Sequence, residues 1–107
     1  MGVAEVSTLH VVNKSPFERN ALKSCIAHLS ESDAVILIED AVVAAKRGSV
    51  VAPLIQETLK KIPVYVLGAD LAARAIKQED VIAEMKLVDY HEFVELATRH
   101  HCTQSWL

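Results

Sequence analysis

Cys25 is the side chain with the greatest potential for chemistry, because a thiolate is both a nucleophile and a soft metal ligand. At helical spacing its neighbours are Ala21, Leu22 and Leu29, so it lies near the centre of an apolar stripe. It is too far from a helix start at Ser15 to gain from the helix dipole, and no suitably spaced cation favours the thiolate. We therefore expect a buried core cysteine, with a redox-active or persulfide-carrying thiol as the alternative.

Acidic side chains follow the apolar runs of the sequence. Glu39 and Asp40 could form an acid/base or magnesium site, but an acid between a strand and a helix is more often a helix cap, which is our prediction for Asp40. Glu39 is expected to point into a crevice at the strand ends or onto a partner surface. Asp70 and Asp89 are interpreted as caps for the same reason as Asp40.

The C-terminal segment offers two further features. His100, His101 and Cys102 are consecutive potential soft-metal ligands, but neighbouring residues of a helix diverge and no second ligand pair has zinc-like spacing, so no metal site is predicted. Trp106, the single tryptophan, lies in a tail without periodicity. It is expected either to pack back onto its own domain or to be buried in a partner.

Motifs of self-sufficient catalysis are missing from the sequence. It contains 3 glycines, with no phosphate-binding glycine loop, no C-x-x-C pair and no G-x-S-x-G elbow. No cofactor is therefore expected.

Short apolar runs alternate with helical patterns, which is typical of βαβ units. The expected strands are Val6–Val12, Ala34–Ile38, Val64–Leu67 and Leu87–Val88. The expected helices are Ser15 onward, Asp40–Arg47, Pro53–Lys61, Asp70–Ile76 and Asp89–His100. Two of these starts, at Ser15 and Asp89, have a glutamate three residues later, as in a capping box. We predict an α/β three-layer sandwich with a mostly parallel sheet of four or five strands and helices on both faces, and sites beyond the carboxyl ends of the strands.

Length and composition restrict the class of protein. The 107 residues are expected to form a single domain, residues 1–107, with 51% hydrophobic residues and a net charge of −3. Direct nucleic-acid binding is not expected, because no stripe of Lys and Arg is present. Neither a membrane span nor a secretory signal is visible, so we expect a cytoplasmic protein with reduced thiols.

Five segments, taken in order, resemble the DsrH/TusB family. They are Leu9–Phe17, Ile38–Ala45, Tyr65–Arg74, Val88–Val94 and Gln104–Trp106. Cys25 resembles the cysteine that DsrH members carry and TusB members typically lack, which favours DsrH and intracellular sulfur oxidation over thiolation of the tRNA wobble uridine. The chain departs from the family at Ala41 and Ala75, where glycine is usual; both positions fall in or next to the expected helices, where alanine is the better helix former.

The resemblance implies a DsrE-like fold and a heterohexamer with DsrE/TusD-like and DsrF/TusC-like subunits. Such complexes take persulfide sulfur from a TusA-like donor and pass it to a DsrC/TusE-like acceptor, for sulfur oxidation or for 2-thiolation of the tRNA wobble uridine. The principal relay cysteine lies in the DsrE/TusD-type subunit.

We therefore expect an auxiliary, non-catalytic subunit that contacts partners through Glu39, Asp40, Asp70 and Trp106. The alternatives are a stand-alone persulfide carrier that uses Cys25 and a small-molecule-binding α/β module. A homo-oligomer is possible when the chain is isolated.

Overall fold

A five-stranded parallel sheet forms the centre of the computed structural model, which describes residues 6–18 and 20–106. Its order is β4-β3-β2-β1-β5, and every pair of neighbours is parallel. The strands are β1 (Thr8–Val12), β2 (Ala34–Leu37), β3 (Val64–Leu67), β4 (Lys86–Val88) and β5 (Cys102–Trp106). The apolar runs predicted the first four strands, but the tail predicted to be aperiodic is strand β5.

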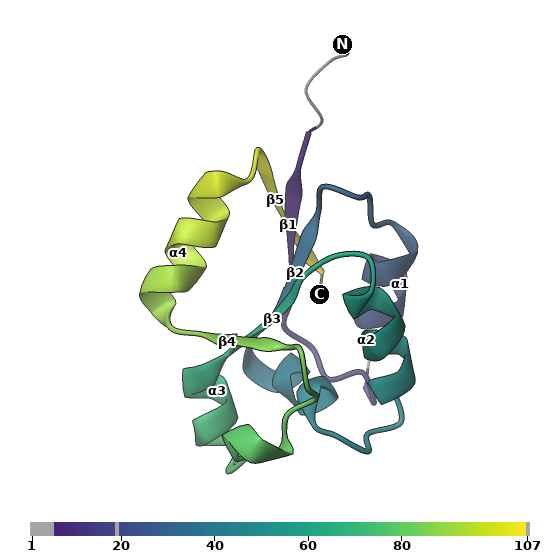
Figure 1. The fold of residues 1–107 in the computed structure, drawn as a ribbon, viewed down its shortest axis with the longest axis vertical. Helices are drawn as coiled ribbons and strands as arrows, with labels where there is room; N and C mark the ends of the chain where they lie inside the picture. Colours follow the sequence, from purple (N-terminus) through teal and green to yellow (C-terminus); the bar gives the residue numbers. More distant parts are fainter. Residues whose placement is uncertain (1–5, 19, 107) are drawn as a thin grey trace.

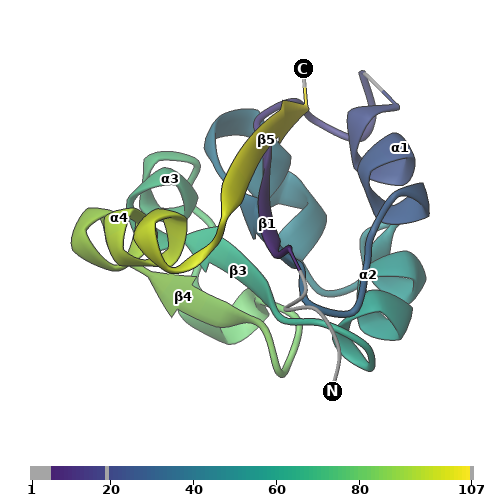
Figure 2. The ribbon, with the colours of Figure 1, turned by 90° about the horizontal axis from the view of Figure 1, so that it is seen from above.

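Helices cover both faces of the sheet, as predicted for a three-layer sandwich. They are α1 (Ala21–Ala27), the 3-10 helix η1 (Glu39–Ala45), α2 (Ala52–Leu59), α3 (Gly68–Ala73), the short 3-10 turn η2 (Gln78–Asp80) and α4 (Tyr90–Arg99). Figures 1 and 2 show α1 and α2 on one face and α4 on the other. The chain moves in one direction along the sheet from β1 to β4 and then returns across it to β5. Because each crossover is right-handed, connections that run in opposite directions place their helices on opposite faces of the sheet.

Apolar side chains fill the space on each side of the sheet. The larger cluster includes Val12, Cys25, Ile55 and Val66, and the smaller one packs Leu9 and its neighbours against α4. Among the described residues, no helix is both long and apolar enough to span a membrane.

The prediction of a capped helix at Ser15 is wrong. The Ser15 carbonyl accepts a hydrogen bond from the Glu18 N–H (3.1 Å), and the Ser15 hydroxyl accepts one from the Phe17 N–H (3.2 Å). These contacts form a β-turn with Pro16 at its second position, where the fixed φ of proline is favoured. Helix α1 begins only at Ala21.

Two of the three predicted aspartate caps are also wrong. Asp89 does cap α4: it accepts the Glu92 N–H (2.8 Å), and Glu92 accepts the Asp89 N–H (3.0 Å). Asp40 and Asp70 instead lie inside the first turns of η1 and α3, because each helix starts directly at the end of its strand. Their carboxylates are free for contacts across the strand ends.

Ala75 adopts a left-handed backbone conformation, with φ of 57°. It follows the end of α3, and the Ile76 N–H donates to the Leu71 carbonyl (3.0 Å), the pattern of a Schellman C-cap. The helix predicted to run from Asp70 through Ile76 therefore ends before Ala75. A glycine at this position has a direct physical reason, because glycine adopts a positive φ without a Cβ penalty. Ala41, in contrast, lies within η1 and is buried.

Candidate functional site

The carboxyl ends of β2 and β3 bring the three predicted acidic residues together. The Glu39 N–H donates a hydrogen bond of 2.6 Å to the Asp70 carboxylate. Glu39 holds a φ of 49°, a left-handed conformation that costs a residue with a Cβ about 1–2 kcal/mol. Strain of this kind concentrates at functional positions of folded proteins.

Arg74 completes this cluster, and we call Glu39, Asp40, Asp70 and Arg74 the rim cluster. Its guanidinium donates to Asp40 Oδ1 from two nitrogens, at 2.8 Å and 3.2 Å, and to the Asp70 carbonyl at 3.1 Å. The guanidinium thus fixes η1 to α3. Sequence reasoning placed Arg74 in a family motif but gave it no role.

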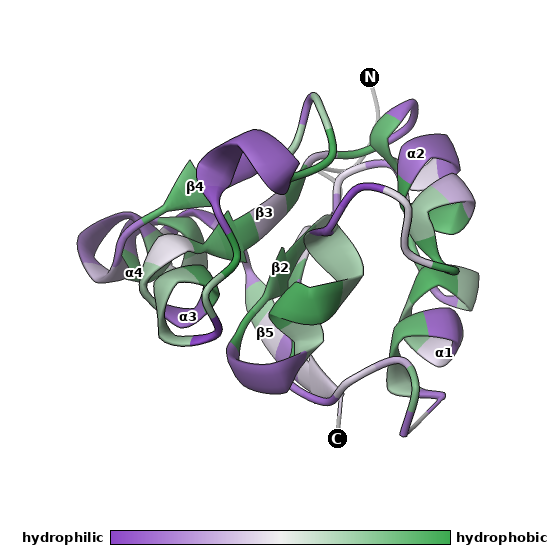
Figure 3. Ribbon diagram, turned by 90° about the horizontal axis from the view of Figure 1, so that it is seen from below, coloured by the Kyte–Doolittle hydropathy of each residue, from purple (hydrophilic) through white to green (hydrophobic). Residues whose placement is uncertain are grey.

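The rim cluster forms an open polar surface. Glu39 and Asp40 are exposed, while Asp70 and Arg74 are half-buried. In Figure 3, which views the molecule from this end, hydrophilic stretches flank the apolar short helix in front of the sheet. In residues 6–18 and 20–106 no group of three His, Cys, Asp or Glu side chains is arranged to hold a metal ion. A polar, partly exposed surface of this kind is typical of the rim of a protein–protein interface.

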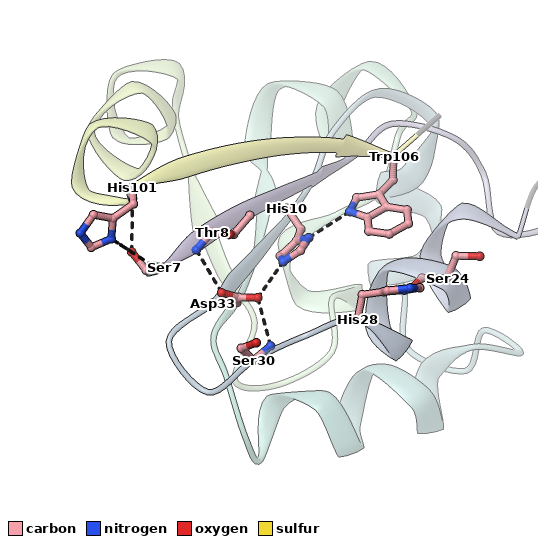
Figure 4. A network of polar contacts seen from close by, with 9 residues as sticks. All are labelled: Ser7, Thr8, His10, Ser24, His28, Ser30, Asp33, His101 and Trp106. Atoms are coloured by element: carbon pink, nitrogen blue, oxygen red, sulfur yellow. Dashed lines mark hydrogen bonds and ion pairs between the residues drawn. The ribbon is translucent and has the colours of Figure 1, made fainter. Parts of the chain in front are cut away.

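Trp106 lies at the end of β5 and packs back onto its own domain. Its indole Nε1–H donates to His10 Nδ1 at 3.0 Å (Figure 4). The His28 ring, at the end of α1, is tilted against the indole with 5.5 Å between ring centroids. Of the two predicted environments, the isolated chain shows the first.

His10 links Trp106 to a buried carboxylate, that of Asp33. His10 Nε2 lies 2.8 Å from Asp33 Oδ2, and both side chains are buried. Because the Trp106 indole can only donate, His10 Nδ1 must accept, and the ring proton lies on Nε2, where it donates to Asp33.

Asp33 is the anchor of this network. It also accepts the Thr8 N–H (3.0 Å) and the Ser30 N–H (3.0 Å). Burial alone would raise the pKa of Asp33, but the hydrogen bonds from His10, Ser30 and Thr8 outweigh burial and lower that pKa below its ordinary value. The network ties β1, the turn before β2 and the end of β5 together (Figure 4).

Cys25 is completely buried in the larger core cluster, as its helical neighbours predict. Burial, with a smaller contribution from the negative charge of Asp33, raises the pKa of its thiol to about 12. A thiol of this kind is protonated at neutral pH and is a poor nucleophile. The other thiol, Cys102, is exposed on the edge strand β5.

Sequence reasoning missed the whole Asp33–His10–Trp106 network. A polar His10 inside an otherwise apolar strand, with Asp33 directly before the next strand, was the available signal. Its meaning depends on β5, because only the pairing of β5 with β1 brings Trp106 beside His10.

The sheet order and the helix layers define a three-layer α/β sandwich. The crystal structure of the ychN protein from Escherichia coli has this fold: its TM-score is 0.78 at 19% sequence identity, covering 95% of this chain and 100% of that chain.

Sequence comparison then identifies the family. A family profile described as "DsrH like protein" matches residues 14–103. Protein TusB of Erwinia tasmaniensis is 38% identical over 100 residues, covering 92% of this chain and 99% of that protein. Protein TusB of Escherichia coli K12 is 32% identical over 100 residues with the same coverage. The chain belongs to the DsrH-like family.

Proposed function

We propose that this chain is an auxiliary subunit of a cytoplasmic sulfur-relay complex. In the complex it assembles with DsrE/TusD-like and DsrF/TusC-like subunits into a heterohexamer. Membership of the DsrH-like family supports the proposal. The structural observation that best supports an auxiliary role is that the thiol of Cys25 is buried, whereas the rim cluster lies at the surface.

The sulfur transfer itself requires two accessible thiols. An acceptor thiolate attacks the sulfane sulfur of a donor persulfide, a new S–S bond forms on the acceptor, and the donor leaves as a thiolate with no net oxidation. A TusA-like donor and a DsrC/TusE-like acceptor supply the two ends of this exchange. Cys25 is neither accessible nor easily ionised to a thiolate, since it is buried and its pKa is raised to about 12. Cys25 is therefore not the relay cysteine of this proposal, which places that cysteine in the DsrE/TusD-like subunit.

The pathway we favour is 2-thiolation of the tRNA wobble uridine. The TusB relatives support it, at 38% and 32% identity over nearly their full length. Intracellular sulfur oxidation is the alternative, and the presence of Cys25, as in DsrH members, is the feature in its favour. Loss of thiolated wobble uridine after deletion of the gene, measured by mass spectrometry of hydrolysed tRNA, would separate the two pathways.

We assign the partner contact to Glu39, Asp40 and Asp70, with Trp106 at the carboxyl end of the edge strand β5. These acids lie beyond the carboxyl ends of β2 and β3, where α/β proteins place their sites. Glu39 is exposed and holds a strained backbone, which a residue selected for stability alone would avoid.

The chain contains a matched control for this assignment. Glu84 is also an exposed glutamate with a left-handed φ, of 70°, but it precedes β4 and so lies at the opposite end of the sheet. Glu39→Gly and Glu84→Gly therefore each remove one glutamate carboxylate and relieve the same kind of backbone strain. Only the first changes the rim cluster.

The experiment is affinity purification of the tagged chain from its own cells, followed by quantitative mass spectrometry. The wild-type and Glu84→Gly chains are expected to recover two related subunits in equal amounts, one of them with an exposed cysteine. Recovery with Glu39→Gly should fall several-fold. A wild-type chain that elutes alone with an additional sulfur atom on Cys25 would contradict the proposal and identify the chain as the carrier.

A further inference from the structure

A basic groove lies at the same end of the sheet as the rim cluster. It has a volume of about 540 Å³ and runs between the turn after β1, the segment after η1 and the end of α3. Its main side chains are cationic or apolar: Phe17, Val43, Lys46, Arg47, Arg74 and Ile76. We propose that this groove binds an acidic, extended segment of a partner protein that also carries an apolar side chain. The inference does not depend on the sulfur chemistry proposed above.

Charge complementarity is the first argument for an acidic occupant. Three cations line the groove, and no Asp or Glu is among its lining residues. Because the chain as a whole has a net charge of −3, a groove lined by cations and by no carboxylate departs locally from its overall charge.

Two of the three cations, Lys46 and Arg47, remain available to a partner, whereas Arg74 already donates to Asp40. Arg47 lies 3.9 Å from Asp80, and the two side chains are 63% and 44% exposed. An exposed pair at this distance is weak and screened by salt, so a partner's carboxylate can replace Asp80. Lys46 forms no ion pair within residues 6–18 and 20–106.

An exposed aromatic side chain supplies the apolar part of the surface. Phe17 is 61% exposed, although burial of such a ring is worth about 2–3 kcal/mol. Aromatic and arginine side chains together are typical of the residues that dominate binding energy at protein interfaces. An occupant with acidic and apolar side chains uses both parts of the groove.

The openness of the groove favours a polypeptide over a small anion. Small-ligand sites enclose most of the ligand and hold it with a few buried polar groups. Here the charged side chains extend into solvent, and even the more buried Arg74 is 29% exposed.

The wall of the groove is fixed before binding. The Arg47 N–H donates to the Asp80 carbonyl (2.7 Å), and the Ile82 N–H donates to the Ala45 carbonyl (2.8 Å). Lys46 and Val81 form a β-bridge between these two contacts. Little backbone ordering is then required on association, which favours binding.

The probe is a fluorescein-labelled peptide of about twelve Asp, Glu, Gly and Leu residues, compared with a version in which Asn and Gln replace the acids. Fluorescence anisotropy with the full chain should show saturable binding of the acidic peptide at low salt, weakened several-fold near 300 mM NaCl. The neutral peptide should bind at least tenfold more weakly. Phe17→Ala should weaken binding of the acidic peptide several-fold.

Two double variants locate the binding site. Lys46→Glu with Arg47→Glu should weaken the acidic peptide at least tenfold. Lys60→Glu with Lys61→Glu makes the same change in net charge at the end of α2, outside the groove. This control should weaken binding of the acidic peptide less than threefold. Circular dichroism checks that both variants are folded.

Three results would overturn the proposal. One is the absence of saturable binding up to millimolar wild-type protein. Another is an equal loss in both double variants, which would indicate attraction to net charge alone. The third is self-association of the wild-type chain that Lys46→Glu with Arg47→Glu abolishes, which would make a second copy the occupant.

Discussion

Replacement of Asp33 is the sharpest test of the network that holds the C-terminal strand. Asp33→Ala leaves three donors without their acceptor: His10 Nε2–H, the Thr8 N–H and the Ser30 N–H. The two backbone groups can recover hydrogen bonds to water, because Thr8 is only half-buried and Ser30 is exposed. His10 is 5% exposed and cannot. A buried donor that loses an ionised acceptor costs about 1.5–3 kcal/mol, and because two backbone hydrogen bonds to the carboxylate are lost as well, we expect the free energy of unfolding to fall by about 3 kcal/mol.

Asp33→Asn is the more informative variant. Its amide oxygen can keep the Thr8 contact, but its NH2 group then faces the proton on His10 Nε2. If His10 moves that proton to Nδ1, the new N–H points at the donor of Trp106. The Ser30 N–H faces the same NH2 group but can turn to water, because Ser30 is exposed. Either arrangement therefore leaves one buried pair of opposed donors, and we expect a loss of about 2 kcal/mol.

Trp106 reports on this loss directly, because it is the only tryptophan of the chain. Urea titrations followed both by far-ultraviolet circular dichroism and by tryptophan fluorescence should give lower midpoints for both Asp33 variants. Native-state emission of Asp33→Asn should also shift. Asp80→Asn is the control, because its partner Arg47 is 3.9 Å away and both side chains are exposed; it should change stability by less than about 0.5 kcal/mol. An Asp33→Asn variant as stable as this control, with unchanged emission, would refute the reasoning.

The pH dependence has a definite sign. The pKa of Asp33 is lower in the folded chain than in the unfolded chain, where it is about 3.9. The carboxylate therefore contributes stability above the unfolded pKa, and this contribution is lost as the pH falls through the lower folded pKa. The difference between wild type and Asp33→Asn should be constant above about pH 5 and shrink below about pH 4.

Two further predictions concern single residues. Ala75→Gly should raise the free energy of unfolding by about 0.5–1 kcal/mol in urea titrations, because glycine holds a φ of 57° without the Cβ penalty; an unchanged or lower midpoint would contradict this. In the native protein, an aromatic disulfide reagent should modify the exposed Cys102 quickly and the buried Cys25 only at the rate of unfolding, with Cys102→Ser isolating the slow phase; fast reaction of both thiols would contradict the burial of Cys25.

Apolar runs and the capping motif at Asp89 were sufficient to predict most of the fold. Ala34–Leu37 is buried along its whole length, so its pattern needed no knowledge of its neighbours. Strand β5 was missed because four of its five residues are exposed on a sheet edge, which leaves no alternation to detect. Ser15 was misinterpreted because serine followed by proline starts a turn as readily as it caps a helix.

The candidate site was predicted in place but not in detail. The sequence located Glu39, Asp40 and Asp70 at strand ends, since parallel strands end at a common edge. It did not predict that Arg74 pairs with Asp40, because that contact depends on how η1 and α3 approach each other. It could not predict the left-handed φ of Glu39 either, since local preferences of a glutamate oppose it.

The distribution of strain and exposure at the strand ends supports a surface that acts on other proteins. Glu39 and Ala75 hold left-handed conformations there, Phe17 is 61% exposed, and Lys46 and Arg47 extend into solvent. Each of these features either lowers the stability of the isolated chain or leaves it unchanged. The thiol of Cys25, in contrast, is buried in the core. A stand-alone catalyst would show the opposite pattern, with an accessible nucleophile beside the strained backbone. This pattern supports the proposed role as an auxiliary subunit, in which partner proteins cover the exposed groups at the strand ends.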